Sequence, residues 1–229
     1  MKILIGIPAY NEEQTVSSVI KSIPKKIDKI NKIDIVVVND GSKDATARVA
    51  ESSKATILNH IINRGLGGAL KTIFAYGKLL NYDIIVTFDA DGQHDSRDLS
   101  CLIRPIVENK TDVVIGTRWK KNKNVPFSRL IVNKIANIIT FLLFGVWSTD
   151  SQSGFRAFGK KAIQLINLQS DGMEVSSEFF REIFRNKLRY TEVPINTIYT
   201  NYSKSKGQKL SNAPNVFFQL LLKLLRFLD

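Results

Sequence analysis

The sequence predicts an α/β fold in which a mostly parallel β-sheet is covered by helices. Short runs rich in valine and isoleucine alternate along the chain with longer stretches of helical pattern, as in repeated βαβ units. Three of the predicted strands also end in polar loops of similar composition. Because the carboxyl ends of parallel strands meet at one edge of a sheet, we expect these loops to open on one crevice.

The individual strands are predicted from the β-branched runs, and the helices fill the gaps between them. Asp44 or Ser42 precedes the second helix as a capping residue, and Asp95 or Ser96 precedes the fourth. Right-handed crossovers are expected between the parallel strands. The predicted strands lie near 2–8, 33–39, 55–59, 83–88 and 111–116, and the helices near 12–23, 43–53, 66–80 and 96–109.

The 229 residues suit one large domain, or one domain with an appendage, and suffice for a real core. The single cysteine, Cys101, excludes an internal disulfide framework. Met1 and Lys2 lead directly into a strand-like run, so no signal peptide is expected. The best apolar candidate, 138–147, is about half of the roughly 20 residues that a membrane-spanning helix needs. If the protein meets a membrane, we expect it to lie on the surface.

The formal net charge of +12 calls for an anionic partner, such as nucleic acid, lipid phosphate or an anionic substrate. The chain has neither zinc-finger spacing nor the aromatic pattern of an RNA-recognition motif. Nucleic acid is therefore not the expected partner.

Asp89 and Asp91 follow the buried-looking strand near 83–88 and are one residue apart. Carboxylate oxygens at the end of a strand suit Mg²⁺ or Mn²⁺, with room left for water and phosphate oxygens. Gln93 offers a neutral oxygen to the same ion. The alternative is that the two acids are solvated or cap a helix. The loops on the neighbouring strands favour a metal site against a diphosphate.

Those neighbouring loops contain an aromatic ring, Tyr10, and the carboxylates of Glu12 and Asp40. A nucleobase can stack on the ring, and ribose hydroxyls are donors that seek acidic acceptors. A simpler interpretation is that Asp40 and its neighbours only form a turn and a helix cap. That interpretation accounts for one loop but not for the repetition.

Taken in order, these segments resemble the motifs of family-2 glycosyltransferases with the GT-A fold, strongly over about 2–160. Within that family the chain is most similar to dolichyl-phosphate mannose synthases and their bacterial polyprenyl-phosphate relatives. The segments that carry the resemblance are Pro8-Ala9-Tyr10-Asn11-Glu12-Glu13, Val38-Asn39-Asp40-Gly41-Ser42-Lys43-Asp44, Asp89-Ala90-Asp91-Gly92-Gln93-His94, Gly116-Thr117-Arg118 and Ser153-Gly154-Phe155-Arg156.

The resemblance implies a role for each matching residue. Arg118 would face the phosphates, where a guanidinium and a metal ion would neutralise the leaving diphosphate. The base and ribose would be held by Pro8, Tyr10, Glu12, Val38 and Asp40. The metal and diphosphate would be surrounded by Asp89, Ala90, Asp91 and Gln93.

Two acceptors are compatible with the remaining residues. A sugar hydroxyl needs a carboxylate base, for which Asp150 is the candidate, whereas a lipid phosphate is already ionised and needs cations instead. Arg129 begins a segment with a wide apolar face, 130–144, that suits docking on a bilayer, although a core helix has the same pattern. By the resemblance, Lys206 lies in a lid over the acceptor. Where related enzymes carry arginine six positions earlier, this chain has Thr200.

The C-terminal run 216–228 is apolar except for a narrow stripe of Gln219, Lys223 and Arg226. Such a helix needs cover from lipid, from its own domain or from a second copy of the chain. We therefore divide the chain into a GT-A domain, 1–200, and a basic loop with an amphipathic helix, 201–229.

The predicted function is inverting, metal-dependent transfer of a hexose from GDP-mannose or UDP-glucose to a polyprenyl phosphate. The expected location is the cytoplasmic face of a membrane, with peripheral attachment and a homodimer as an option. Asp91 and Arg118 act on the donor, Arg129 and Lys206 steer the acceptor phosphate, and Asp150 orients that site. The alternatives are a soluble enzyme that acts on a saccharide hydroxyl with Asp150 as base, and a non-catalytic nucleotide- or nucleic-acid-binding module.

Overall fold

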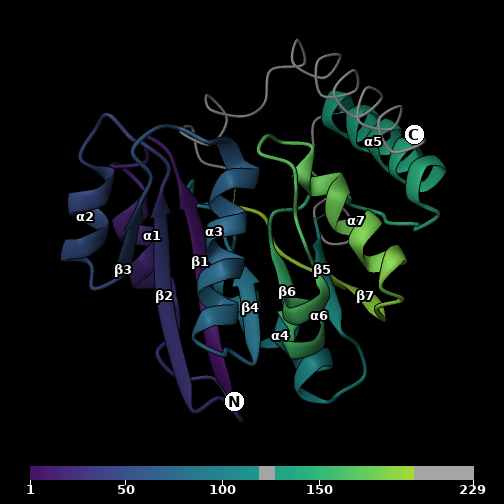
Figure 1. Ribbon diagram of the computed structural model, residues 1–229, viewed down its shortest axis with the longest axis horizontal. Coiled ribbons are helices and arrows are strands. Elements are labelled where there is room, and N and C mark those ends of the chain that lie inside the picture. The colour runs from purple at the N-terminus through teal and green to yellow at the C-terminus, as the bar shows by residue number, and fades with distance from the viewer. Residues whose placement is uncertain (119–126, 199–229) are drawn as a thin grey trace.

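A computed structural model describes residues 1–118 and 127–198. Its centre is a seven-stranded sheet in the order β3-β2-β1-β4-β6-β5-β7 (Figure 1). All neighbouring strands pair in parallel except β6, which is antiparallel to both β4 and β5. This confirms the predicted α/β class. The strands are β1 (Lys2–Ala9), β2 (Lys32–Asn39), β3 (Thr56–Asn59), β4 (Ile84–Thr87), β5 (Val113–Thr117), β6 (Arg156–Gly159) and β7 (Tyr190–Pro194).

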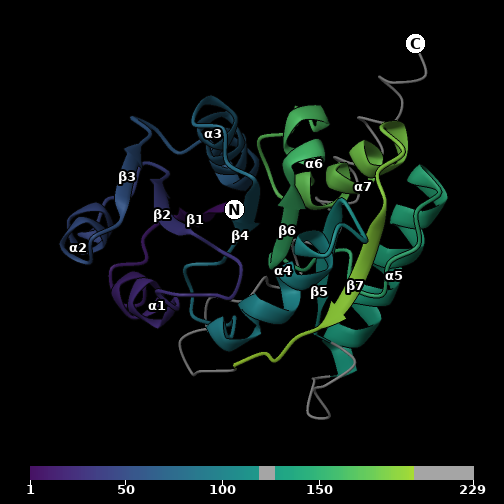
Figure 2. The same cartoon turned by 90° about the horizontal axis from the view of Figure 1, so that it is seen from below.

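Helices cover both faces of the sheet (Figure 2). The α1, α2 and α4 side chains pack in one core cluster and those of α3, α6 and α7 in the other. Strand β1 contributes to both clusters, because alternate side chains of a strand point to opposite faces of the sheet. Ile3 and Ile5 lie in the first cluster and Leu4 lies in the second. The helices are α1 (Val16–Ser22), α2 (Thr46–Ser52), α3 (Gly65–Leu79), α4 (Leu99–Val107), α5 (Phe127–Phe144), α6 (Lys160–Leu165) and α7 (Val175–Arg185), with a 3₁₀ turn, η1 (Ser96–Asp98), before α4.

The five predicted strands and four predicted helices are confirmed, with shifts at the helix starts. Helix α1 begins at Val16 rather than near residue 12, and the residues before it belong to a loop in which the backbone N–H of Glu12 donates to Thr46 Oγ1. Asp44 accepts from the backbone of Thr46 at the start of α2, and Asp95 accepts from that of Arg97 at η1. Asp95 therefore caps the 3₁₀ turn that precedes α4, whereas the N-cap residue of α2 is Ala45 and Asp44 lies one residue before it.

Strand β6 decides which segments meet at the site. Because it runs against its neighbours, the loop before it lies at the same edge as the carboxyl ends of β4 and β5. Arg156 pairs with Thr87 on one side and with Ile115 on the other. Residues 150–155 consequently face the loop after β4.

Candidate active site

The loops after β1 and β2 interlock at the carboxyl edge of the sheet. The Asn11 backbone N–H donates to Ser42 Oγ at 2.9 Å, and the Lys43 backbone N–H donates to Asn11 Oδ1 at 2.9 Å. Tyr10, directly after β1, is 43% exposed, and Glu12 in the same loop is half-buried. Tyr10 and Glu12 thus lie at the edge of the sheet where the crevice is expected, and their contacts with a base and ribose remain a prediction.

Asp40 is buried, and its carboxylate is already engaged. Oδ1 accepts from His60 Nδ1 at 2.6 Å and from the Arg64 backbone N–H at 2.9 Å, while Oδ2 accepts from the Gly65 backbone N–H at 2.8 Å. Asp40 thus holds the loop between β3 and α3 beside the loops that follow β1 and β2. A contact with ribose would compete with these bonds.

The contacts of Val38 and Ala90 with a ligand stay predictions, and only their backbone groups are placed to make them. Val38 is fully buried in the core cluster on the α3 side, and Ala90 is buried in the opposite cluster. The alternation of β2 turns the Val38 side chain into the core, and Ala90 is buried in the turn after β4. Pro8, in contrast, lines a small cavity beneath the site.

Asp89 stands at the end of β4 with its side chain 39% exposed. His94 Nε2 lies 2.9 Å from Asp89 Oδ2, and the imidazole is buried and stacked on Phe155, with ring centroids 4.9 Å apart. Burial alone would raise the pKa of Asp89, but the charges of His94, Arg118 and Arg156 lower it on balance. His94 therefore fixes the orientation of Asp89 and keeps it ionised.

Asp91 is half-buried beside Asp89 and receives two hydrogen bonds from Gln93. The Gln93 backbone N–H donates to Oδ1 at 2.9 Å, and the Gln93 amide Nε2 donates to Oδ2. Burial and the negative charge of Asp89 raise the pKa of Asp91. Gln93 thus supports Asp91 through its N–H groups instead of offering its amide oxygen to a metal in this arrangement.

Gly154 presses the loop before β6 against Asp89. A Cβ atom at residue 154 would lie 2.5 Å from both carboxylate oxygens of Asp89. Thr87 Oγ1 donates to the Gly154 carbonyl at 2.6 Å, which fixes this approach. Only glycine leaves room for Asp89 here.

Arg118, at the end of β5, forms a fork with the fully buried Asp150. Its Nε and Nη2 donate to Oδ2 and Oδ1 of Asp150 at 2.8 and 2.6 Å, and its backbone N–H donates to Oδ2 at 3.0 Å. Both carboxylate oxygens therefore face the guanidinium, as in bidentate pairing. This geometry suits a carboxylate that orients Arg118 better than a base waiting for a hydroxyl.

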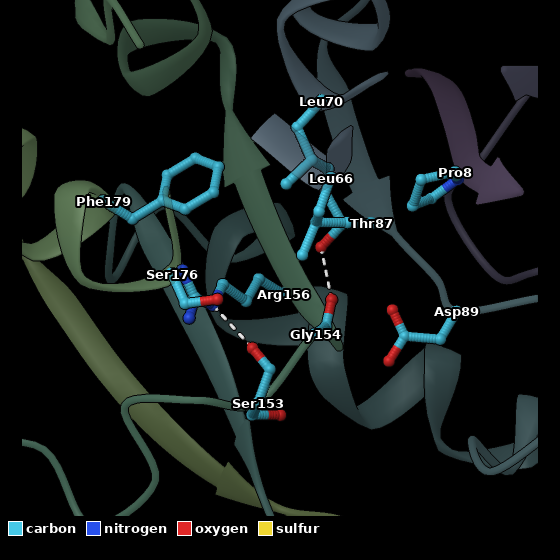
Figure 3. Close-up of a pocket in the computed structure, with 10 residues that line it drawn as sticks. All are labelled: Pro8, Leu66, Leu70, Thr87, Asp89, Ser153, Gly154, Arg156, Ser176 and Phe179. Atoms are coloured by element: carbon cyan, nitrogen blue, oxygen red, sulfur yellow. Dashed lines mark hydrogen bonds between the residues drawn. The ribbon is translucent and has the colours of Figure 1, made fainter. Parts of the chain in front are cut away.

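Arg156 lies buried under this group and lines a small cavity with Asp89, Ser153 and Ser176 (Figure 3). Its Nε and Nη2 donate to the carbonyls of Ser153 and Ser151 at 2.8 Å each. Burial lowers the pKa of Arg156 to about 10, although Asp150 and Asp89 oppose the shift. Arg156 therefore holds the 150–154 loop and stays charged at neutral pH.

The described residues fit a divalent cation that shares its coordination with a ligand. No group of three or more histidine, cysteine, aspartate or glutamate side chains within 1–118 and 127–198 is arranged to enclose a metal ion. Asp89 and Asp91 instead repel each other at one edge, which a cation relieves. Mg²⁺ and Mn²⁺ accept such partial sites, with diphosphate and water completing the oxygen shell.

The side chains of the predicted acceptor residues lie outside the described part of the chain. Arg129 lies in α5, but its side chain is outside the described set, and Lys206 and the run 216–228 lie beyond residue 198. Within the described residues, no helix has the length and hydropathy to cross a membrane.

The sheet, its edge loops and the Asp89–Asp91 pair define an α/β protein with two neighbouring carboxylates at the carboxyl edge of its sheet. The sequence model described as glycosyl transferase family 2 matches residues 4–166, so the chain belongs to glycosyl transferase family 2 and is a glycosyltransferase. This confirms the resemblance read from the motifs and the predicted enzyme class.

Two relatives and one solved structure illustrate the family. The UDP-N-acetylglucosamine–dolichyl-phosphate N-acetylglucosaminyltransferase of Methanococcus voltae is 37% identical over 99% of this chain and 98% of its own. The undecaprenyl-phosphate mannosyltransferase of Micrococcus luteus is 30% identical over 90% and 87%. Glucosyl-3-phosphoglycerate synthase of Mycobacterium tuberculosis, solved with Mn²⁺ and UDP-glucose, shares the fold with a TM-score of 0.75 at 21% identity, over 98% of this chain and 78% of that one.

Three site residues lacked a role in the sequence-based interpretation: His94, Gly154 and Arg156. Each lies in a segment that carries the family resemblance, but its contacts in the site involve the antiparallel strand β6 or the loop before it. His94 had one usable signal, because it follows Asp89 by five residues in the same loop. Nothing in the spacing indicates that Gly154 touches Asp89.

Proposed function

We propose that this glycosyltransferase moves one hexose, with inversion, from a nucleotide sugar to a polyprenyl phosphate. The observation that carries the proposal is the meeting of Asp89 and Asp91 with the Arg118–Asp150 fork at one sheet edge. The charge of Arg118 is among those that lower the pKa of Asp89, as expected of a guanidinium near this carboxylate. That combination suits a departing diphosphate.

In the proposed reaction, an acceptor phosphate oxygen bonds to the anomeric carbon while the bond from that carbon to the diphosphate breaks. The electron pair of the broken bond leaves with the nucleoside diphosphate. Asp89 and Asp91 would hold a Mg²⁺ or Mn²⁺ ion, which would supply positive charge for this leaving group. Arg118 adds a fixed guanidinium, and Asp150 keeps it in place.

The acceptor assignment draws on the two relatives, whose names both specify a polyprenyl-type phosphate. A phosphate is ionised at neutral pH, which agrees with an Asp150 that is occupied by Arg118. We further propose that Arg129 and Lys206 bind the acceptor phosphate and that the protein attaches peripherally to the cytoplasmic face of a membrane. For the donor we propose a uridine diphosphate sugar, because the Methanococcus relative is named for one.

The transfer assay separates these proposals. The enzyme is incubated with labelled UDP-N-acetylglucosamine, UDP-glucose or GDP-mannose and with either a short polyprenyl phosphate or free saccharides. We expect lipid-linked product from a UDP sugar. Product on saccharide alone would refute the lipid acceptor, and exclusive use of GDP-mannose would refute the uridine donor. A thermal-shift panel with the same sugars and Mn²⁺ gives an independent ranking, since a bound ligand raises the melting temperature.

Asp150→Asn tests the orienting role. The new amide places an N–H group against the guanidinium of Arg118, so we expect kcat to fall about 100-fold, as for loss of one oriented charge donor. Arg118→Lys keeps the charge but loses the fork, with a similar loss. The double variant should lose little more than either single variant, because the pair acts as a unit.

The pH profile distinguishes the two roles of Asp150. With a lipid phosphate acceptor, we expect Asp150→Asn to lower kcat by the same factor across the profile. If the wild type loses kcat at low pH and Asp150→Asn no longer shows this fall, Asp150 acts as a base.

A further inference from the structure

The loop between β3 and α3 presents two neighbouring isoleucines to solvent. Ile61 is 100% exposed and Ile62 is 69% exposed. Single exposed apolar side chains are common on protein surfaces, whereas neighbouring ones on a fixed backbone form a candidate contact site. None of the proposed chemistry uses these two side chains.

The backbone on both sides of the pair is anchored. The His60 N–H donates to the Asn39 carbonyl at 2.9 Å, and the Arg64 N–H donates to Asp40 at 2.9 Å. The His60 ring adds contacts from Nδ1 to Asp40 and from Nε2 to Thr72 Oγ1, at 2.6 and 2.8 Å. The exposed position of the isoleucines is therefore built into the fold.

The loop also has no room to turn its side chains inward. A Cβ atom at Gly41 would lie 2.6 Å from the Asn63 nitrogen and 2.7 Å from the Ile62 carbonyl carbon. The backbone of 62–63 thus rests directly on that of Gly41. Ile61 and Ile62 remain on the outer side of this contact.

The loop lies at the carboxyl edge of the sheet, the edge that carries the candidate active site. In Figure 1 this is the upper end of the molecule, where α5 also lies. Helix α5 exposes apolar side chains of its own, with Ile138 at 49% and Leu142 at 74%. Helix α3 begins beside the loop and ends at the opposite edge, where Leu79 is 80% exposed.

We propose that Ile61 and Ile62 insert into the surface of a membrane that contains anionic lipids. This inference rests on the proposed lipid acceptor, because an enzyme acting on a membrane-bound phosphate has to bring this edge to the bilayer. Two side chains are far too small for a protein interface, which needs roughly 800 Å² per partner. Insertion between lipid headgroups needs apolar depth and nearby positive charge instead.

Positive charge is available at the loop. Arg64 in the loop and Lys43 after β2 are both exposed, and the net charge of the chain is +12. The carboxylates of Asp44 and Glu13 in the neighbouring loops are held by the backbone N–H groups of Thr46 and Ala45. In the proposed docking, Arg64 and Lys43 pair with lipid phosphates while the isoleucines enter the acyl boundary.

The test is co-sedimentation of the full chain with vesicles of phosphatidylcholine and phosphatidylglycerol. The double variant Ile61→Ser/Ile62→Ser is compared with Leu79→Ser, which removes an equally exposed aliphatic side chain from the other end of α3. We expect the double variant to bind vesicles about tenfold more weakly, while Leu79→Ser binds like the wild type. Melting temperature and nucleotide-sugar binding should be the same in all three proteins.

Two results would overturn the inference: equal vesicle binding by the double variant and the wild type, or a changed oligomeric state with unchanged vesicle binding, which would assign the pair to a second copy of the chain. Transfer to a short, water-soluble polyprenyl phosphate separates this inference from the proposed function. If the wild type makes no lipid-linked product, the function fails whatever the vesicles show. If the double variant keeps full transfer in solution and loses vesicle binding, both proposals stand.

Discussion

Asp91→Ala is expected to lower kcat by about a thousandfold, because it removes one of the two carboxylates that would hold the metal ion against the diphosphate. Asp91 is half-buried and carries a pKa raised by burial and by Asp89, so its removal does not destabilise the fold by this route. Steady-state transfer with saturating Mn²⁺ measures the loss. Treatment of the wild type with EDTA should reproduce it, and added Mn²⁺ should restore activity to the wild type alone.

Asp28→Ala serves as the matched control, since Asp28 is exposed and lies in the connection between α1 and β2, away from the active-site edge. It should retain full activity. Full activity of Asp91→Ala, or of the wild type in EDTA, would contradict metal-dependent transfer. Turnover that survives both treatments together with nucleotide binding would indicate a donor site that needs no metal ion.

Gly154→Ala is expected to reduce kcat at least about 100-fold, a loss typical of removing one oriented charged group. The added methyl group would overlap both oxygens of Asp89, and the bond from Thr87 to the Gly154 carbonyl prevents the loop from retreating. Asp89 must then leave its contact with His94. The same transfer assay, with a metal titration, should show a raised Mn²⁺ requirement.

Gly145→Ala is the control for this substitution. Gly145 ends α5 with a φ of +65°, and a Cβ atom there would meet only Phe184, at 3.6 Å. The control should lose about 1 kcal/mol of stability from the left-handed backbone yet keep its activity. If Gly154→Ala were as active as Gly145→Ala, the close packing at Asp89 would have no role in transfer.

Most of the sheet could be predicted from the sequence because its strands carry their own signal. The β-branched runs in β1, β2 and β4 are buried on both faces and bounded by turn residues, which is the pattern of central parallel strands. Strand β6 has no such signal. Its four residues include Arg156 and Gly159, and their extended form comes from pairing with β4 and β5.

The same distinction applies to the site. Asp89 and Asp91 were predicted from one loop, because their chemistry lies in adjacent residues. The fork between Arg118 and Asp150 depends on the direction of β6, which no local pattern encodes. The bonds from Asp40 to His60 and Gly65 join segments that are 20 and 25 residues apart, and they give Asp40 a role as a loop anchor that no local pattern indicates.

The reversed strand has a consequence for how substrate preference can change. The residues expected to hold the base and ribose all precede residue 41, whereas the loop that Arg156 secures comes from beyond residue 149. The two portions meet through the pairing of β4 with β6, through the bond from Thr87 to the Gly154 carbonyl and through the close approach of Gly154 to Asp89. Exchange of the later portion between related enzymes, with that glycine retained, should therefore alter what receives the sugar and leave the choice of sugar donor intact.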